Sequence, residues 1–157
     1  MTNSVELLFI PIQNGDDTTY KVLATIQTAK KRFIILGSLP SAKAVFDAYN
    51  EWQELYEALL HELHPLVFAP LPVIPDISQG ILDQKTGELR RNLNNWLIYP
   101  GFIPINNKMW GVFNDQDEIL LIVKTDDENL SKLPFHLWNF FNDFRKTVLI
   151  LSNLENS

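Results

Sequence analysis

Three side chains near the end of one predicted helix have the types and the spacing of metal ligands. Glu57, His61 and His64 recur at intervals of four and three residues, which places them on one helical face. Carboxylate oxygen and imidazole nitrogen both bind zinc, so the group is a candidate site for a small metal-dependent enzyme. The two histidines are, however, closer together than in the zincin signature. Histidine also stabilises the last turn of a helix, and that simpler role is the preferred interpretation.

Two acidic clusters are the other candidates for chemistry. Asp115, Asp117 and Glu118 resemble part of a calcium loop, but the glycine and the distal glutamate of an EF-hand are missing. Residues 126–128 are all acidic and follow a predicted strand. At such a place a solvated turn is more common than an acid–base pair. Neither cluster therefore predicts a metal site or a catalytic site.

Other catalytic patterns are missing from the sequence. The chain contains no cysteine, which excludes disulfides, thiolate nucleophiles and cysteine-ligated metal centres. Its glycines are dispersed and form no phosphate-binding loop, and no Gly-x-Ser-x-Gly nucleophile elbow occurs. We therefore expect no enzymatic activity, no cofactor and no bound metal, with the enzyme built on Glu57, His61 and His64 as an alternative.

The charge of the chain limits its partners. The net charge is -6, and the basic residues form only short clusters, such as those at residues 30–32 and 90–91. Nucleic acid and anionic membranes require a concentrated positive field, so neither is an expected partner. No apolar run reaches the roughly 18 residues that span a bilayer, and the first residues lack the layout of a signal peptide. The sequence thus predicts a cytoplasmic protein.

The pattern of apolar residues predicts an α+β fold in a single domain over residues 1–157. Strands are predicted at residues 5–12, 20–26 and 32–36, and Asn14-Gly15 suits a tight turn within this antiparallel meander. Two further strands, at residues 118–124 and 147–151, have apolar centres typical of buried parallel strands. With the aromatic helix predicted between them at residues 133–144, they form a βαβ unit that joins a mixed sheet.

Helical spacing predicts a long amphipathic helix from about residue 41 to residue 64. Its apolar stripe, which includes Trp52 and Tyr56, is expected to pack on the sheet. Leu89 to Leu97 mark a second helix, and a short one is predicted near residues 105–113. Several prolines make residues 65–75 an extended loop, and residues 153–157 are expected to be a frayed tail.

Aromatic residues are unusually dense between residues 135 and 144. Core packing is their simplest role, but a helix this aromatic has more than one apolar face, and part of it can lie at a partner interface. The strand that follows would offer unpaired backbone groups if it lies at a sheet edge. A protein partner or a second copy is therefore expected to contact Trp138, Phe140, Phe141, Phe144, Val148 and Leu149. The alternative is that the proline-rich segment at residues 65–75 or the tail folds over this edge and covers it.

Three consecutive stretches carry a resemblance to a known family. They are residues 119–127 (ILLIVKTDD), residues 133–139 (LPFHLWN) and residues 148–152 (VLILS). Together they resemble a segment of cyanobacterial CHAT-domain proteins, which are caspase-like. Phe135 and Asn139 stand where the family usually has Trp and Asp. A weaker similarity extends upstream through Gly37-x-Leu39-Pro40 and the residues around Trp96.

The resemblance implies a non-catalytic role. In CHAT peptidases the catalytic His and Cys lie downstream of this segment, and His136 matches a position that is not the catalytic His. The chain is therefore expected to be an interaction or regulatory module, similar to the amino-terminal part of the family. A truncated remnant of a larger CHAT protein is a further alternative.

Overall fold

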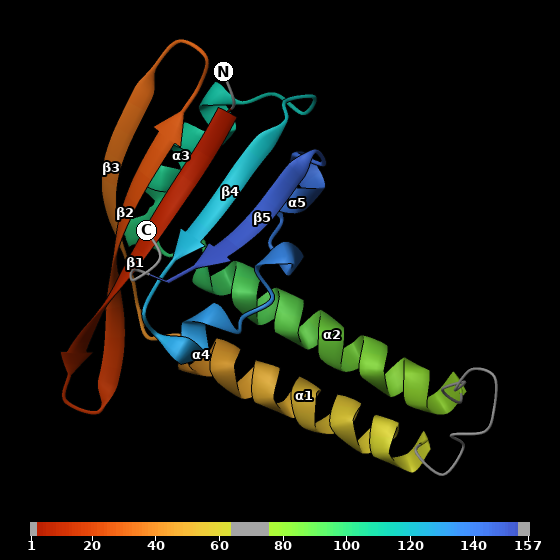
Figure 1. Ribbon diagram of the computed structural model, residues 1–157. Helices are drawn as coiled ribbons and strands as arrows, with labels where there is room; N and C mark the ends of the chain where they lie inside the picture. Colours follow the sequence, from red (N-terminus) through yellow and green to blue (C-terminus); the bar gives the residue numbers. More distant parts are fainter. Residues whose placement is uncertain (1–2, 64–75, 154–157) are drawn as a thin grey trace. The chain divides into compact units, whose positions relative to one another are not determined.

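The predicted strands assemble into one five-stranded mixed sheet with the order β3-β2-β1-β4-β5 (Figure 1). The computed structural model describes residues 3–63 and 76–153, with side chains for residues 3–60 and 79–153. The predicted α+β class is confirmed. The predicted loop at residues 65–75 and the predicted tail beyond residue 153 lie outside the described residues.

The described residues group into two compact units, where the sequence predicts one domain. The sheet unit consists of described residues within 1–42 and 93–157, and the helical unit of those within 43–92.

An antiparallel meander forms one side of the sheet, as predicted. Its strands are β1 (Asn3–Asn14), β2 (Asp17–Gln27) and β3 (Arg32–Leu39). Gly15 reverses the chain between β1 and β2 with a φ of 64°, a conformation that only glycine adopts without strain. Alternate residues of β1, including Val5, Leu7 and Phe9, are fully buried. They define the inner face of the sheet, and the intervening residues define the outer face.

The other side of the sheet is parallel. β4 (Ile119–Lys124) lies beside β1, and β5 (Thr147–Ser152) lies beside β4 at the end of the sheet. The predicted burial of both strands is only partly correct. β4 buries its inner face alone, and β5 has no buried residue. Burial on both faces requires helices on both sides of a sheet, and no described element of the sheet unit buries the outward residues of β4 and β5.

The predicted aromatic helix is wrong, because the crossover from β4 to β5 consists of three short pieces. These are α4 (Glu128–Ser131), η3 (Phe135–Leu137) and α5 (Phe140–Asp143). Trp138 separates the last two with an extended backbone at φ -66° and ψ 139°. The Asn94 side chain stabilises this break between the two helical pieces. It donates to the Leu137 carbonyl at 3.0 Å and accepts from the Asn139 N–H at 2.8 Å.

The inner face of the sheet is covered by helical elements. Near β3 these are η2 (Pro100–Phe102) and α3 (Ile103–Val112), and the latter confirms the short helix predicted near residues 105–113. Figure 1 shows α3 and α5 on the same side of the strands. Glycine permits the close approach of β3 and η2. A Cβ on Gly37 would lie 2.7 Å from Ile105 Cδ1 and 2.9 Å from the Gly101 carbonyl oxygen.

The helical unit pairs α1 (Lys43–Leu63) with α2 (Asp76–Trp96), whose end from Leu93 belongs to the sheet unit. Half-buried Trp52 on α1 donates to the Thr86 hydroxyl on α2 at 2.9 Å, and Thr86 donates to the Leu82 carbonyl at 2.9 Å. Tyr56 stacks on Trp52 and remains exposed. The packing of Trp52 and Tyr56 on the sheet stays a prediction, and within the helical unit Trp52 contacts α2.

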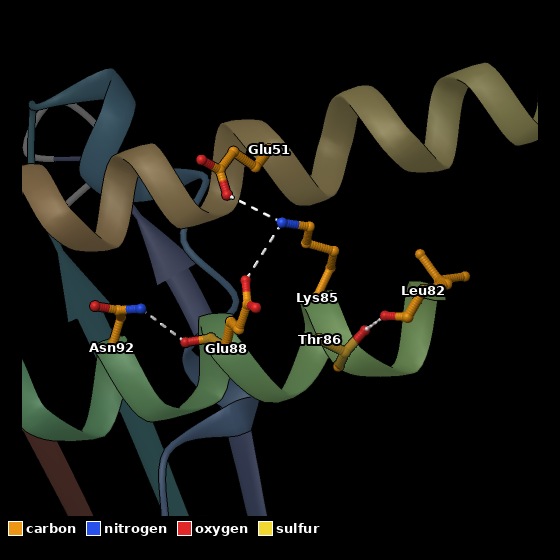
Figure 2. Close-up of polar contacts among 6 residues, drawn as sticks. All are labelled: Glu51, Leu82, Lys85, Thr86, Glu88 and Asn92. Carbon is orange, nitrogen blue, oxygen red and sulfur yellow. Dashed lines mark hydrogen bonds and ion pairs between the residues drawn. The ribbon is translucent and has the colours of Figure 1, made fainter. Parts of the chain in front are cut away.

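A lysine bridges the two helices of this unit. Figure 2 shows Lys85 on α2 between Glu51 on α1 and Glu88 on α2, with N···O distances of 3.5 Å to both. The charge of Glu88, followed by that of Glu51, raises the pKa of Lys85. The bridge lies in solvent, where such pairs add little stability, so its main contribution is to the register of α1 against α2.

Candidate protein-interaction site

β5 forms one edge of the described sheet. It is the last strand in the sheet order, with β4 on one side and no described strand on the other (Figure 1). Val148, Ile150 and Leu151 are 60%, 43% and 47% exposed. An edge strand that carries exposed aliphatic side chains is a template for pairing with another strand.

Two hydrogen bonds show which backbone groups of β5 point away from β4. The N–H groups of Ile119 and Thr125 donate to the carbonyls of Lys146 and Ser152 at 3.3 and 3.2 Å. In a parallel ladder, alternate residues of the edge strand direct both backbone groups to the neighbouring strand, and the residues between them direct both outward. With this phase, Leu149 and Leu151 present their N–H and carbonyl groups at the open edge.

The predicted contact residues divide into a strand group and an aromatic group. Val148 is exposed and Leu149 is half-buried, as a docking strand requires. Trp138, Phe140 and Phe144 are almost fully buried, and Phe141 is half-buried. The expectation that the aromatic segment supplies contact area is therefore wrong for the three buried residues, since the chain's own core encloses them.

The aromatic residues form a cluster on the inner side of the sheet unit. The Phe140 ring lies 4.7 Å from that of Phe144, 5.2 Å from that of Trp138 and 5.4 Å from that of Trp110, measured between centroids. Trp110 comes from α3 and donates its indole N–H to the Asp143 carboxylate at 2.8 Å. Sequence reasoning missed Trp110, because nothing local relates it to residues about 30 positions away.

An open hollow of about 720 Å³ lies at the carboxyl ends of β4 and β5. Acidic residues line it, and ligands often bind at this end of parallel strands. Asp127, however, already accepts the N–H groups of Asn129 and Leu130 as the cap of α4 and receives the Tyr20 hydroxyl at 2.9 Å. Among the described side chains, Asn106 Oδ1 is the buried polar atom without a partner, and Asn106 does not line the hollow.

Tyr20 is expected to make stability depend on alkaline pH. Burial raises the pKa of Tyr20 above its ordinary value of 10.0, and the hydrogen bond and the charge of Asp127 raise it further. The neutral phenol therefore stabilises the fold below pH 10.0, and this contribution is lost as the pH rises through the folded-state pKa.

Urea unfolding between about pH 8 and 11 should consequently show a smaller fall in the free energy of unfolding for Tyr20→Phe than for the native chain. Equal falls in the free energy of unfolding of the two proteins would refute the link between the ionisation of Tyr20 and stability.

The predicted metal ligands do not form a site within the described structure. Glu57 is exposed on α1, the His61 side chain is outside the described set, and His64 lies outside the described residues. Asp117 stabilises a turn by accepting the Asn114 N–H at 2.9 Å. In the described part of the chain, His, Asp and Glu nowhere form a group of three that could hold a metal ion.

None of the described helices is long and apolar enough to cross a membrane. No protein-family model matches the chain, and no curated protein or solved structure shows significant similarity to it. The fold and the site therefore define an α+β protein with an open parallel sheet edge.

Proposed function

We propose that this chain is a non-catalytic interaction module that binds an extended segment of another protein along β5. The observation that carries the proposal is the edge at Leu149 and Leu151, which pairs with no described strand. An added strand would bond to the outward backbone groups of these residues and place its side chains beside Val148 and Ile150. In this mode of recognition the main-chain bonds supply affinity and the flanking side chains supply specificity.

We also propose a relationship to the amino-terminal, non-catalytic part of CHAT-type proteins. The order of β4, helical crossover and parallel β5 over the segment that resembles that family supports it. In a longer protein of this kind, the next strand of the sheet would occupy the β5 edge. As a separate cytoplasmic module, the chain would take that strand from a protein partner or from a second copy.

The decisive experiment uses a proline at the edge. Leu151→Pro removes an outward N–H and leaves the inward ladder intact, which edge strands tolerate. Immobilised native chain should retain a partner from extracts of its own cells, and Leu151→Pro should lose the same protein. Ile98→Lys, at an aliphatic residue outside the sheet that is more exposed than Leu151, should retain it.

If the partner is a second copy, light scattering over a concentration series should show association that Val148→Lys or Leu149→Lys weakens. Equal retention of one protein by native, Leu151→Pro and Ile98→Lys chains would refute docking at β5.

A further inference from the structure

The outer face of the sheet carries exposed apolar residues near both of its edges, although no described element of the sheet unit buries them. Ile34 and Leu36 on β3 are both 63% exposed, and Val148 and Ile150 on β5 are exposed as well. The solvated face of a sheet is normally polar at these alternate positions. Parallel strands such as β1, β4 and β5 are usually covered on both faces. The outer face thus resembles a sheet face that packs against a second layer of structure.

The register of the strands arranges these residues into two patches. Pairing between neighbouring strands aligns the outward residues in rows that cross the sheet. One row contains Leu36, Leu23, Leu8 and Lys124. The next row contains Ile34, Thr25, Glu6, Ile122 and Ile150. The β3 patch is defined as Leu23, Ile34 and Leu36, and the β5 patch as Leu120, Ile122, Val148 and Ile150. Between them, Glu6 and Lys124 form an ion pair at 3.3 Å.

We propose that the outer faces of two copies of this chain pack against each other in a homodimer. Five strands about 4.8 Å apart make a face roughly 24 Å wide, and these two rows together with the row of Leu120 and Val148 cover about 20 Å along the strands. Each copy thus offers on the order of 500 Å² of projected area, and the pair about 1,000 Å², the lower size of specific interfaces. A single helix about 10 Å wide leaves half of this face uncovered, whereas another sheet face matches it.

The arrangement of the patches also suits a two-fold axis. An axis along the central strand β1 places β3 of one copy over β5 of the other, so Ile34 of one copy lies over Ile150 of the other, twice. Both faces then run nearly parallel, as in aligned sheet packing. The dimer leaves the outward backbone groups of β5 available, so the inference does not depend on strand addition.

Sedimentation equilibrium of the purified native chain tests the dimer. We expect a monomer–dimer equilibrium that Leu36→Lys weakens by about tenfold or more, because the lysine would be enclosed in the β3 patch. Ile98→Lys introduces the same charge at a residue with 62% exposure outside the face and should leave dimerisation unchanged. Leu151→Pro should also dimerise normally.

Engineered disulfides test the register without relying on the lysine variant, since the native chain has no cysteine. A mixture of Ile34→Cys and Ile150→Cys chains should cross-link faster than either variant alone. A native chain that stays monomeric to about 1 mM would overturn the inference. So would a dimer that Leu151→Pro abolishes and Leu36→Lys does not, although that result would support strand addition at β5.

Discussion

Replacing Phe140 by alanine is expected to lower the free energy of unfolding by about 3–5 kcal/mol, the usual cost of truncating a buried aromatic residue. Phe140 is fully buried and contacts the rings of Trp110, Trp138 and Phe144. Its removal leaves a cavity that the short pieces of the crossover are too constrained to fill, because Asn94 holds their backbone. Chemical denaturation measures the loss.

The neighbouring residue provides the control. Phe141 touches the Phe140 ring edge-on but is only half-buried, so Phe141→Ala should cost about 1 kcal/mol. Similar losses for the two variants would contradict the difference in burial between Phe140 and Phe141 and would mean that the aromatic cluster does not hold the crossover.

A methyl group on Gly101 is expected to destabilise the chain by about 1–3 kcal/mol. A Cβ at this position would overlap Ser38 Oγ and lie 2.9 Å from the Ser38 carbonyl oxygen. The carbonyl belongs to β3 and cannot turn away without loss of the sheet register, so η2 must move. Thermal or urea unfolding of Gly101→Ala measures the cost.

Gly111 supplies a control of opposite sign. It lies within α3, and an added Cβ there meets no atom within 4 Å. Because alanine favours helix over glycine, Gly111→Ala should stabilise the chain by about 0.5–1 kcal/mol. A loss in both variants would contradict the account of the close contact between β3 and η2.

Local patterns predict much of the sheet. The Asn-Gly turn and the alternation of β1 and β2 predict the hairpin, and the apolar runs predict β3, β4 and β5. That β4 is buried on one face only could not be predicted, since an apolar run looks the same whether one or both faces of the sheet are covered. The exposure of the Ile34 and Leu36 side chains could not be predicted for the same reason.

Two helical segments show where periodicity alone is insufficient. α2 begins at Asp76, well before the predicted start at Leu89, because its first half is mostly polar. That half contacts α1 through Thr86 and Lys85, which a search for apolar spacing does not detect. The aromatic segment fails for another reason, since the contact of Asn94 with Leu137 and Asn139 joins residues more than 40 positions apart.

The candidate site was predictable in part. The sequence predicts a strand at residues 147–151, and the structure places that strand at the end of the described sheet. It could not distinguish the half-exposed Phe141 from the buried Phe140. That difference depends on Trp110, which α3 brings to the cluster from outside the segment.

The central claim is that β5 accepts a strand through Leu149 and Leu151. Residue-resolved amide hydrogen exchange, measured on the chain alone and in its partner complex, tests it most directly. We predict fast exchange at these two amides in the isolated chain, slow exchange at the inward amides of Val148 and Ile150, and strong protection of Leu149 and Leu151 in the complex. Amides of Leu149 and Leu151 that are as protected in the isolated chain as those of central β1, or unchanged by the partner, would contradict the claim.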